Sequence, residues 1–155
     1  RVIPLVQQNN GSVDKFLGDG ILVSFGAVYP SDTYAADALR AADSIVLELQ
    51  AWRAARDDAG QIAPKAGVGV ACGEVLFGAI GDESRLEYTI IGDAVNLAAK
   101  LEKQTKAEQV TALTDAASFD LALSQGYKPP AIREHRTQRR IEGVDYSMNL
   151  VVLAG

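Results

Sequence analysis

The sequence predicts an α+β fold in which helices pack on one mostly antiparallel sheet. Short segments with alternating apolar residues occur in pairs, one long segment has helical spacing, and helices and strands alternate after it. The 155 residues suffice for one ordinary domain with its own core. We find no linker, low-complexity tract or internal repeat, so we expect a single domain over residues 1–155.

The first half of the chain is predicted to hold a helix, a hairpin and a second helix. Residues 2–6 look like the last turns of a helix that Asn9-Asn10-Gly11 ends, and we expect further chain upstream of Arg1. The predicted hairpin strands and the glycine turn that joins them lie at 13–17, 21–25 and 18–20. The long helix follows the N-cap candidates Ser31, Asp32 and Thr33 and reaches roughly Asp57.

The second half is predicted to continue the alternation. Residues 65–77 are rich in Val and Gly without a helical period, and Cys72-Gly73 could turn them into a hairpin. A second connection at 81–85 leads into a strand at 88–91, and Gly92-Asp93 caps a helix over about 94–106. The remaining elements are a strand at 109–113, a helix capped by Thr114 or Asp115, and a β region that ends with 148–153.

Composition excludes several classes of function. A formal net charge of −5 argues against a domain that binds DNA or RNA by neutralising phosphates. No run of eighteen apolar residues occurs, so we expect no membrane contact from this segment. The single cysteine, Cys72, rules out an intrachain disulfide, is expected to be a small buried thiol, and is compatible with a cytoplasmic location.

Three features could have a chemical role, and each also has a simpler structural explanation. Asp19, at the tip of a glycine hairpin, could approach a divalent ion, but Asp is also a common turn residue. Asn96, Lys100 and Lys103 share one helix stripe, which could hold a ribose and a phosphate or could be a solvated face. The basic segment 133–140 could bind an anion or could be a charged edge strand or loop. No Walker loop, nucleophile elbow or zinc motif is present.

Three longer motifs, in order, resemble one known family. Residues 13–20 (VDKFLGDG) with 23–26 (VSFG) resemble the start of the class III nucleotidyl cyclase domain. Residues 67–75 (GVGVACGEV) resemble its central strand pair, and residues 88–102 (YTIIGDAVNLAAKLE) its signature segment. The chain is therefore identified, by resemblance, as a class III nucleotidyl cyclase catalytic domain of the adenylate cyclase type.

The resemblance implies a fold and a reaction. The fold would be a ferredoxin-like palm with a βαββαβ core, lacking its N-terminal strand. Such domains convert a nucleoside triphosphate to a 3′,5′-cyclic monophosphate and pyrophosphate, in sites shared by a head-to-tail homodimer. For this chain the resemblance implies ATP as substrate, cyclic AMP as product and a role in cyclic-nucleotide signalling. Sensor or effector domains, and a membrane segment, could lie elsewhere in the full-length chain.

The resemblance also implies roles for individual residues. Asp19 matches one of two aspartates that hold two Mg²⁺ or Mn²⁺ ions. Lys15 and Thr89 match the pair that selects the purine, and their identity favours adenine. Asn96 matches the residue that orients the ribose, and Lys100 the cation that meets charge developing at the α-phosphate.

Three departures from the family pattern argue against an intact enzyme. The first metal aspartate of the family lies on a strand upstream of Arg1. Lys100 stands where Arg is usual and loses the bidentate grip on phosphoryl oxygens. Glu142 stands where a Lys usually touches the β- and γ-phosphates. Its carboxylate would repel the triphosphate unless Arg140, two residues earlier on the same strand face, compensates for this charge.

Two hypotheses follow from these residues. The first is an adenylate cyclase, which Lys15 and Thr89 favour. The alternative, which Lys100 and Glu142 favour, is a catalytically weak or inactive cyclase-like module that dimerises or senses nucleotides. A diguanylate cyclase is disfavoured because no Gly-Gly-Asp-Glu-Phe turn occurs.

Overall fold

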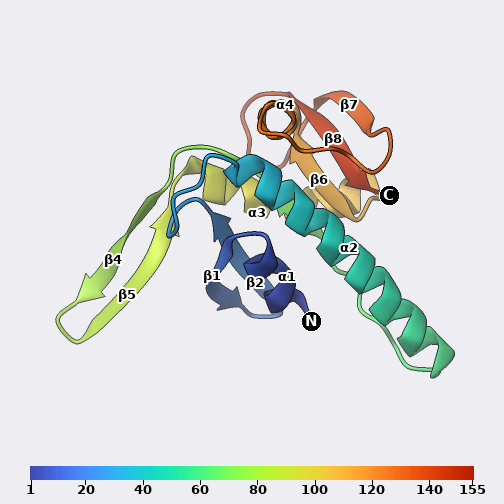
Figure 1. Ribbon diagram of the computed structural model, residues 1–155, viewed down its shortest axis with the longest axis horizontal. Coiled ribbons are helices and arrows are strands. Elements are labelled where there is room, and N and C mark those ends of the chain that lie inside the picture. The colour runs from blue at the N-terminus through green and yellow to red at the C-terminus, as the bar shows by residue number, and fades with distance from the viewer.

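The computed structural model describes residues 1–155 and has four helices and eight strands (Figure 1). The helices are α1 (Val2–Gln8), α2 (Tyr34–Asp58), α3 (Asp93–Glu108) and α4 (Ala116–Ser124). The strands are β1 (Gly11–Leu17), β2 (Gly20–Phe25), β3 (Val68–Val70), β4 (Leu76–Asp82), β5 (Arg85–Ile91), β6 (Ala112–Asp115), β7 (Glu134–Arg139) and β8 (Met148–Ala154). The predicted α+β class is confirmed.

The strands form three hydrogen-bonded sheets, where one was predicted. β1 and β2 make an antiparallel hairpin, and β4 and β5 make a second one. The remaining strands form a four-stranded sheet in the order β3-β6-β8-β7, in which only the β3–β6 pair is parallel. β2 and β3 do not pair with each other, so the sheet that the sequence suggested is divided between them.

Two predicted elements of the second half are wrong in detail. Residues 65–77 do not form a hairpin, because β3 pairs with β6 and β4 pairs with β5. The backbone N–H of Cys72 instead donates to Ser118 Oγ at 2.9 Å, which binds this segment to the start of α4. The strand expected from residue 109 begins at Ala112, because α3 continues to Glu108 and Gln109 takes a left-handed φ of 57°.

Helix α2 packs against two of the three sheets. It contacts α1, α4 and β2, and also β3 and β8 of the four-stranded sheet. In Figure 1 it runs between the β1–β2 hairpin on one side and the sheet with β6 and β8 on the other. Its first half buries mostly small side chains around Leu39: Ala35, Ala36, Ala38, Ala41 and Ala42. Small side chains allow neighbouring elements to approach closely, and the main core cluster forms around this face.

The start of α2 is fixed by residues that are distant in sequence. Thr33 is the N-cap residue, as predicted, but its side chain makes no cap hydrogen bond. Its hydroxyl donates to Asp37 Oδ2 at 3.1 Å. The free backbone N–H groups of Ala35 and Ala36 both donate to Oε1 of Gln125, at 2.8 and 3.2 Å. Gln125, just past α4, therefore supplies the acceptor that helix starts require.

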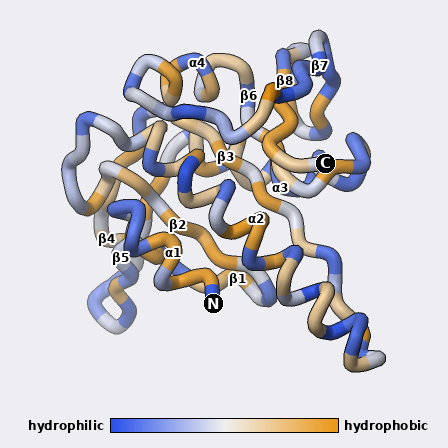
Figure 2. The backbone as a smooth tube through the Cα atoms, turned by 45° about the vertical axis from the view of Figure 1, so that its right-hand side comes forward, coloured by the Kyte–Doolittle hydropathy of each residue, from blue (hydrophilic) through white to orange (hydrophobic).

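The outer parts of the molecule are more polar than its centre. In Figure 2, β2 is drawn largely in hydrophobic colours, whereas the C-terminal end of α2 and the tip of the β4–β5 hairpin are hydrophilic. The chain has no helix that is both long and apolar enough to cross a membrane. Cys72 is half-buried beside the main core cluster, and burial raises the pKa of its thiol.

A buried polar cluster ties α2 to the four-stranded sheet. The Tyr127 hydroxyl donates to Asp43 Oδ2 at 2.6 Å, and Arg133 Nη2 donates to Asp43 Oδ1 at 2.8 Å. The other terminal nitrogen of Arg133 donates to the carbonyl of Leu153 in β8 at 2.7 Å. Burial, and then the hydrogen bond to Asp43, raises the pKa of Tyr127 to about 12.

The Tyr127 shift predicts a loss of stability at high pH. In the unfolded chain a tyrosine loses its proton near pH 10, whereas folded Tyr127 keeps it until about pH 12. The stabilising contribution is therefore complete below pH 10 and is lost as the pH rises from 10 to 12, by roughly 2–3 kcal/mol. Urea unfolding of wild type and Tyr127→Phe from pH 8 to 12 measures this. The advantage of wild type should shrink over that interval, and a constant difference would contradict the assignment.

Candidate functional site

The structure brings Lys15 and Thr89 together through a third residue, Asp14. The Thr89 hydroxyl donates to Asp14 Oδ2 at 2.9 Å, and the backbone N–H of Ile90 donates to Asp14 Oδ1 at 3.2 Å. Lys15 Nζ lies 3.9 Å from Asp14 Oδ2. The Asp14 side chain is only 3% exposed, whereas that of Lys15 is 38% exposed. Lys15 is therefore the exposed member of this group, whereas Thr89 is only 5% exposed and the Asp14 carboxylate is covered.

A β-bulge explains why neighbours in β1 face the same group. Successive side chains of a regular strand point to opposite faces, so Asp14 and Lys15 should diverge. The register of β1 against β2 shifts between Val13 and Lys15, and Asp14 has no partner opposite it. A bulge of this kind redirects side chains, and here Asp14 reaches β5 while Lys15 Nζ stays within 3.9 Å of its carboxylate. Asp14 is a candidate site residue that sequence reasoning missed, because no glycine or other local signal marks the bulge.

Helix α3 carries Asn96 and Lys100 one turn apart, as predicted. Gly92 is the N-cap residue of this helix, and buried Leu101 anchors the opposite face in the second core cluster. Asn96 is exposed and Lys100 is half-buried. Lys100 Nζ donates to the carbonyl of Gly143 at 2.8 Å, so the ammonium is held against the turn that follows β7.

Gly143 has a backbone conformation that favours glycine. Its φ is +85°, in the left-handed region that favours glycine. A Cβ at this position would lie 3.1 Å from Lys100 Cε. A larger residue would therefore strain the backbone and require a small shift of the Lys100 side chain.

The structure corrects the predicted relation of Arg140 to Glu142. β7 ends at Arg139, so Arg140 lies outside the strand and Glu142 lies in a turn. The two do not share a strand face, and both are exposed. The nearest hydrogen-bond acceptor of the Arg140 guanidinium is the carbonyl of Asp145, at 3.5 Å. Arg140 therefore remains free to bind an anion, but it does not offset the charge of Glu142 in the way that the sequence suggested.

Asp19 lies alone at the exposed turn between β1 and β2. No group of three or more His, Cys, Asp or Glu side chains in the chain is placed to hold a metal ion. The chain brings Lys15 and Thr89 together, and Asn96 and Lys100 together, but places no second carboxylate beside Asp19. Its own residues therefore do not fit a complete two-ion site.

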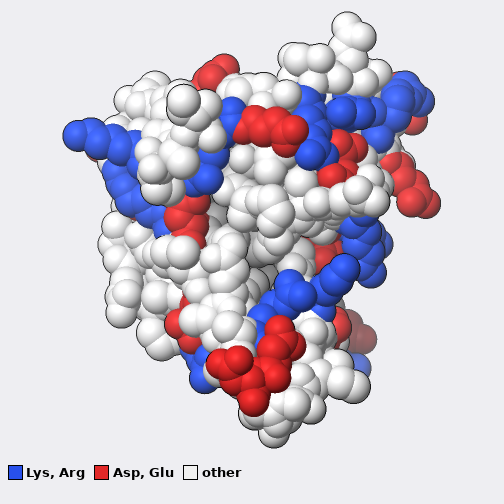
Figure 3. Space-filling view, turned by 90° about the vertical axis from the view of Figure 1, so that its right-hand side faces the viewer, with Lys and Arg blue, Asp and Glu red and all other residues white.

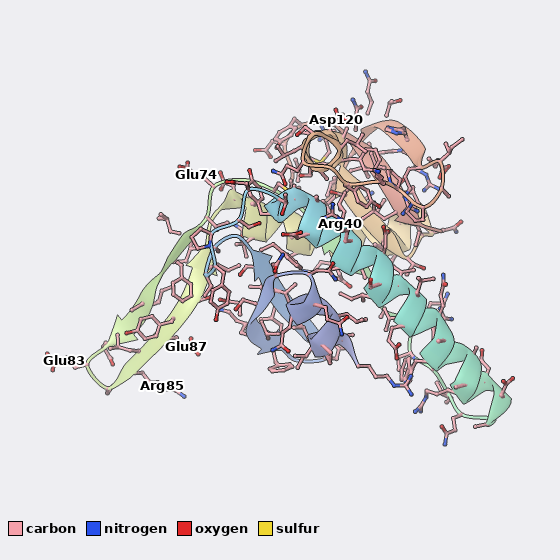
Figure 4. All side chains as sticks on the ribbon, in the orientation of Figure 1. Arg40, Glu74, Glu83, Arg85, Glu87 and Asp120 are labelled. Atoms are coloured by element: carbon pink, nitrogen blue, oxygen red, sulfur yellow. The ribbon has the colours of Figure 1, made fainter.

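The β4–β5 hairpin projects from the rest of the molecule and exposes apolar side chains (Figure 1). Six large apolar residues on it are 47–75% exposed: Leu76, Phe77, Ile80, Leu86, Tyr88 and Ile91. The rings of Phe77 and Tyr88 stack with centroids 6.3 Å apart. Charged side chains lie toward its tip, where Figure 4 shows Glu83, Arg85 and Glu87. Exposed apolar surface of this extent is typical of a protein interface.

The basic segment is a charged edge strand, which was one of its two predicted readings. β7 is the last strand of its sheet, and its arginines pair with carboxylates. Arg136 Nη1 lies 3.1 Å from Glu108 Oε1, and Arg139 Nε lies 3.5 Å from the same atom. His135 packs edge-on against Phe119, with ring centroids 5.8 Å apart. On the face in Figure 3, charges of both signs lie side by side.

Solved cyclases share this fold. The adenylyl cyclase CyaB from P. aeruginosa superposes with a TM-score of 0.81 and 21% identity, over 99% of this chain and 76% of that one. The guanylyl cyclase Cya2 superposes with a TM-score of 0.78 and 25% identity, over 97% of this chain and 73% of that one. The predicted palm fold is confirmed by these neighbours.

Sequence comparison extends the likeness to the family level. Uncharacterized protein Rv1318c of Mycobacterium tuberculosis is 36% identical over 125 residues, which are 78% of this chain and 21% of that protein. The chain thus spans about a fifth of the length of this relative. The family model described as "Adenylate and Guanylate cyclase catalytic domain" matches residues 5–142. The chain therefore belongs to the class III nucleotidyl cyclases, as a catalytic domain of the adenylate and guanylate cyclase type.

Proposed function

We propose that this chain is an adenylate cyclase domain that converts ATP to 3′,5′-cyclic AMP and pyrophosphate in cyclic-nucleotide signalling. The observation that carries the proposal is the Asp14–Lys15–Thr89 group, because its hydrogen-bonding polarity suits adenine. Lys15 presents N–H donors, which match the N1 acceptor of adenine but oppose the N1–H of guanine. The Thr89 hydroxyl gives its proton to Asp14 at 2.9 Å, so its oxygen is left to accept from the 6-amino group of adenine.

The remaining groups would bind and orient the ribose and the phosphates. Asn96, exposed on α3, would hold the ribose, and Lys100, one turn later, would meet the charge that develops at the α-phosphate. An ammonium has three donors, and the carbonyl of Gly143 takes one of them. Lys100 can therefore keep this contact while it donates to a phosphoryl oxygen. Arg140, exposed beyond β7, is the proposed contact of the outer phosphates.

We propose Asp19 as one carboxylate of a site for two Mg²⁺ or Mn²⁺ ions. The resemblance assigns the second carboxylate to a strand that is not among the helices and strands of this chain. β2 and β3 each have one edge without a strand partner, and both contact α2.

We propose that the active unit is a head-to-tail homodimer. Asp19 lies at the β1–β2 turn and makes no hydrogen bond or ion pair with the residues that would bind the base, ribose and α-phosphate. The exposed apolar side chains of the β4–β5 hairpin would be covered by a second copy of the chain. Each complete site would then take Asp19 from one protomer and Lys15, Thr89, Asn96 and Lys100 from its partner.

A second candidate is a cyclase-like module that dimerises or senses nucleotides with little turnover. Glu142 favours it, because this exposed carboxylate sits next to the residue that holds Lys100. A negative charge there would repel a triphosphate. The Lys100 experiment below separates the two candidates.

The base-binding group predicts a preference for ATP over GTP. Guanine would place its N1–H against the donors of Lys15 and its carbonyl against an oxygen of Thr89 that has no proton to give. Such mismatches cost on the order of 1–3 kcal/mol, so kcat/KM should be roughly tenfold to a hundredfold higher with ATP. Initial rates with each nucleotide and Mn²⁺, in the full-length protein, measure this. Equal kcat/KM for both nucleotides would contradict adenine selection.

The shared site predicts complementation between inactive chains. Asp19→Ala and Asn96→Ala chains should each be inactive alone, and mixed dimers should contain one intact site. Random pairing at equal concentrations should restore about a quarter of wild-type activity. Asn96→Ala mixed with Lys100→Ala is the matched control, because both changes damage the same half-site. Recovery in that control, or none in the first mixture, would contradict the shared arrangement.

Lys100 is predicted to limit the rate of the chemical step. Lys100→Arg should raise kcat and leave KM nearly unchanged, because Arg offers a rigid fork of donors to the transition state. Lys100→Met keeps the stem but removes the charge, and should lower kcat on the order of 10²-fold. Lys103→Met is the control, since Lys103 is exposed on the same helix and makes no polar contact. If neither Lys100 variant changes kcat, the regulatory module becomes the better function.

A further inference from the structure

We infer that Asp14 is a positioning residue that sets the base preference of the site, by fixing which way the hydrogen bond of Thr89 runs. The inference rests on the proposed function, because it concerns the same base-binding group. It goes beyond that proposal by assigning part of the selectivity to a buried carboxylate that would not touch the nucleotide.

The Thr89 hydroxyl has one acceptor at short distance for its proton, the carboxylate of Asp14. A threonine hydroxyl can donate or accept, and by itself it would discriminate poorly between an amino group and a carbonyl. A carboxylate can only accept, so the 2.9 Å contact fixes Thr89 Oγ1 as the donor. The alternative acceptor, the carbonyl of Ile90, is farther away at 3.5 Å. The Thr89 oxygen is thereby left as an acceptor for an outside donor such as the 6-amino group of adenine.

Asp14 is itself held in one orientation. Its Oδ1 accepts from the backbone N–H of Ile90, which belongs to β5 and cannot reverse its polarity. Its Oδ2 faces both the Thr89 hydroxyl and the Lys15 ammonium. Because the side chain is 3% exposed, water cannot replace these partners. The bulge in β1 is what brings the carboxylate to this place.

The substitution Asp14→Asn should reverse the Thr89 hydrogen bond. The backbone N–H of Ile90 requires an acceptor, so the asparagine carbonyl should take the place of Oδ1. Its amide nitrogen then stands where Oδ2 was and donates to Thr89 Oγ1. The Thr89 proton is released toward the ligand, where it suits the 6-carbonyl of guanine and opposes the amino group of adenine.

The test is the ratio of kcat/KM for ATP to that for GTP in the full-length protein. Asp14→Asn should lower this ratio about tenfold, without inverting it, because Lys15 still opposes guanine N1–H. Thr89→Val, which removes the hydroxyl at nearly constant volume, should also lower it. Adding Asp14→Asn to Thr89→Val should change the ratio no further, since the hydroxyl that Asp14 orients is gone.

A matched control distinguishes this role from a loss of stability. Asp37 is also a buried carboxylate that accepts from a threonine hydroxyl, that of Thr33 at 3.1 Å, but it belongs to the start of α2. Asp37→Asn should lower the thermal midpoint and leave the nucleotide ratio unchanged. If Asp14→Asn does not fold, Thr89→Val decides alone, and an unchanged ratio in that variant overturns the inference.

Two further results would overturn the inference. One is an unchanged ratio in folded Asp14→Asn, and the other is an equal effect of Asp14→Asn with and without the Thr89 hydroxyl. If wild type turns over neither nucleotide, the proposed function fails but the inference is still tested. The ratio is then measured by competition of ATP and GTP against a ribose-labelled fluorescent ATP. If ATP and GTP compete equally well for wild type, the site has no base preference in binding, and the inference is overturned.

Discussion

The fold depends on one helix face that is lined with small side chains. Two sheets that share no hydrogen bonds need a common support, and α2 provides it by contacting β2 and β3 together. Larger residues in place of Ala35, Ala36 or Ala42 would push α4 and the four-stranded sheet away from the hairpin that carries Asp19 and Lys15. Asp37, Asp43 and Gln125 add polar contacts to the same helix, so its position is fixed by directional bonds as well as by packing.

The candidate site is assembled from elements that this support positions. β1 and β5 meet where Asp14 accepts from Thr89, and α3 meets the turn after β7 where Lys100 donates to Gly143. In each case a backbone group from a neighbouring element orients a charged side chain that would otherwise have many rotamers. Lys100 is thus less mobile than a lysine on an open helix face, which lowers the entropy lost when it meets a phosphate.

Sequence patterns predicted the parts that local signals determine. The β1–β2 turn follows from Gly18 and Gly20, and the start of α4 follows from Asp115, whose side chain accepts from the Ser118 N–H. Sequence patterns did not predict the features that are determined by residues distant in sequence. Cys72-Gly73 reads as a turn, but Ser118 holds the Cys72 backbone in an open segment. Nothing near Ala35 indicates that Gln125, ninety residues later, accepts from its N–H. The bulge at Asp14 has the same origin, because the hydrogen-bond donors of its carboxylate come from β5.

The burial of Asp14 limits how the base pocket can change during evolution. Its carboxylate depends on donors from Thr89, Ile90 and the neighbouring Lys15. A single replacement of Thr89 by an apolar residue removes one of these donors and leaves a buried charge less well satisfied, which destabilises the fold whatever it does to the ligand. Related sequences that differ at Thr89 should therefore differ at Asp14 as well. A lineage that changes one of the two residues first passes through a less stable protein.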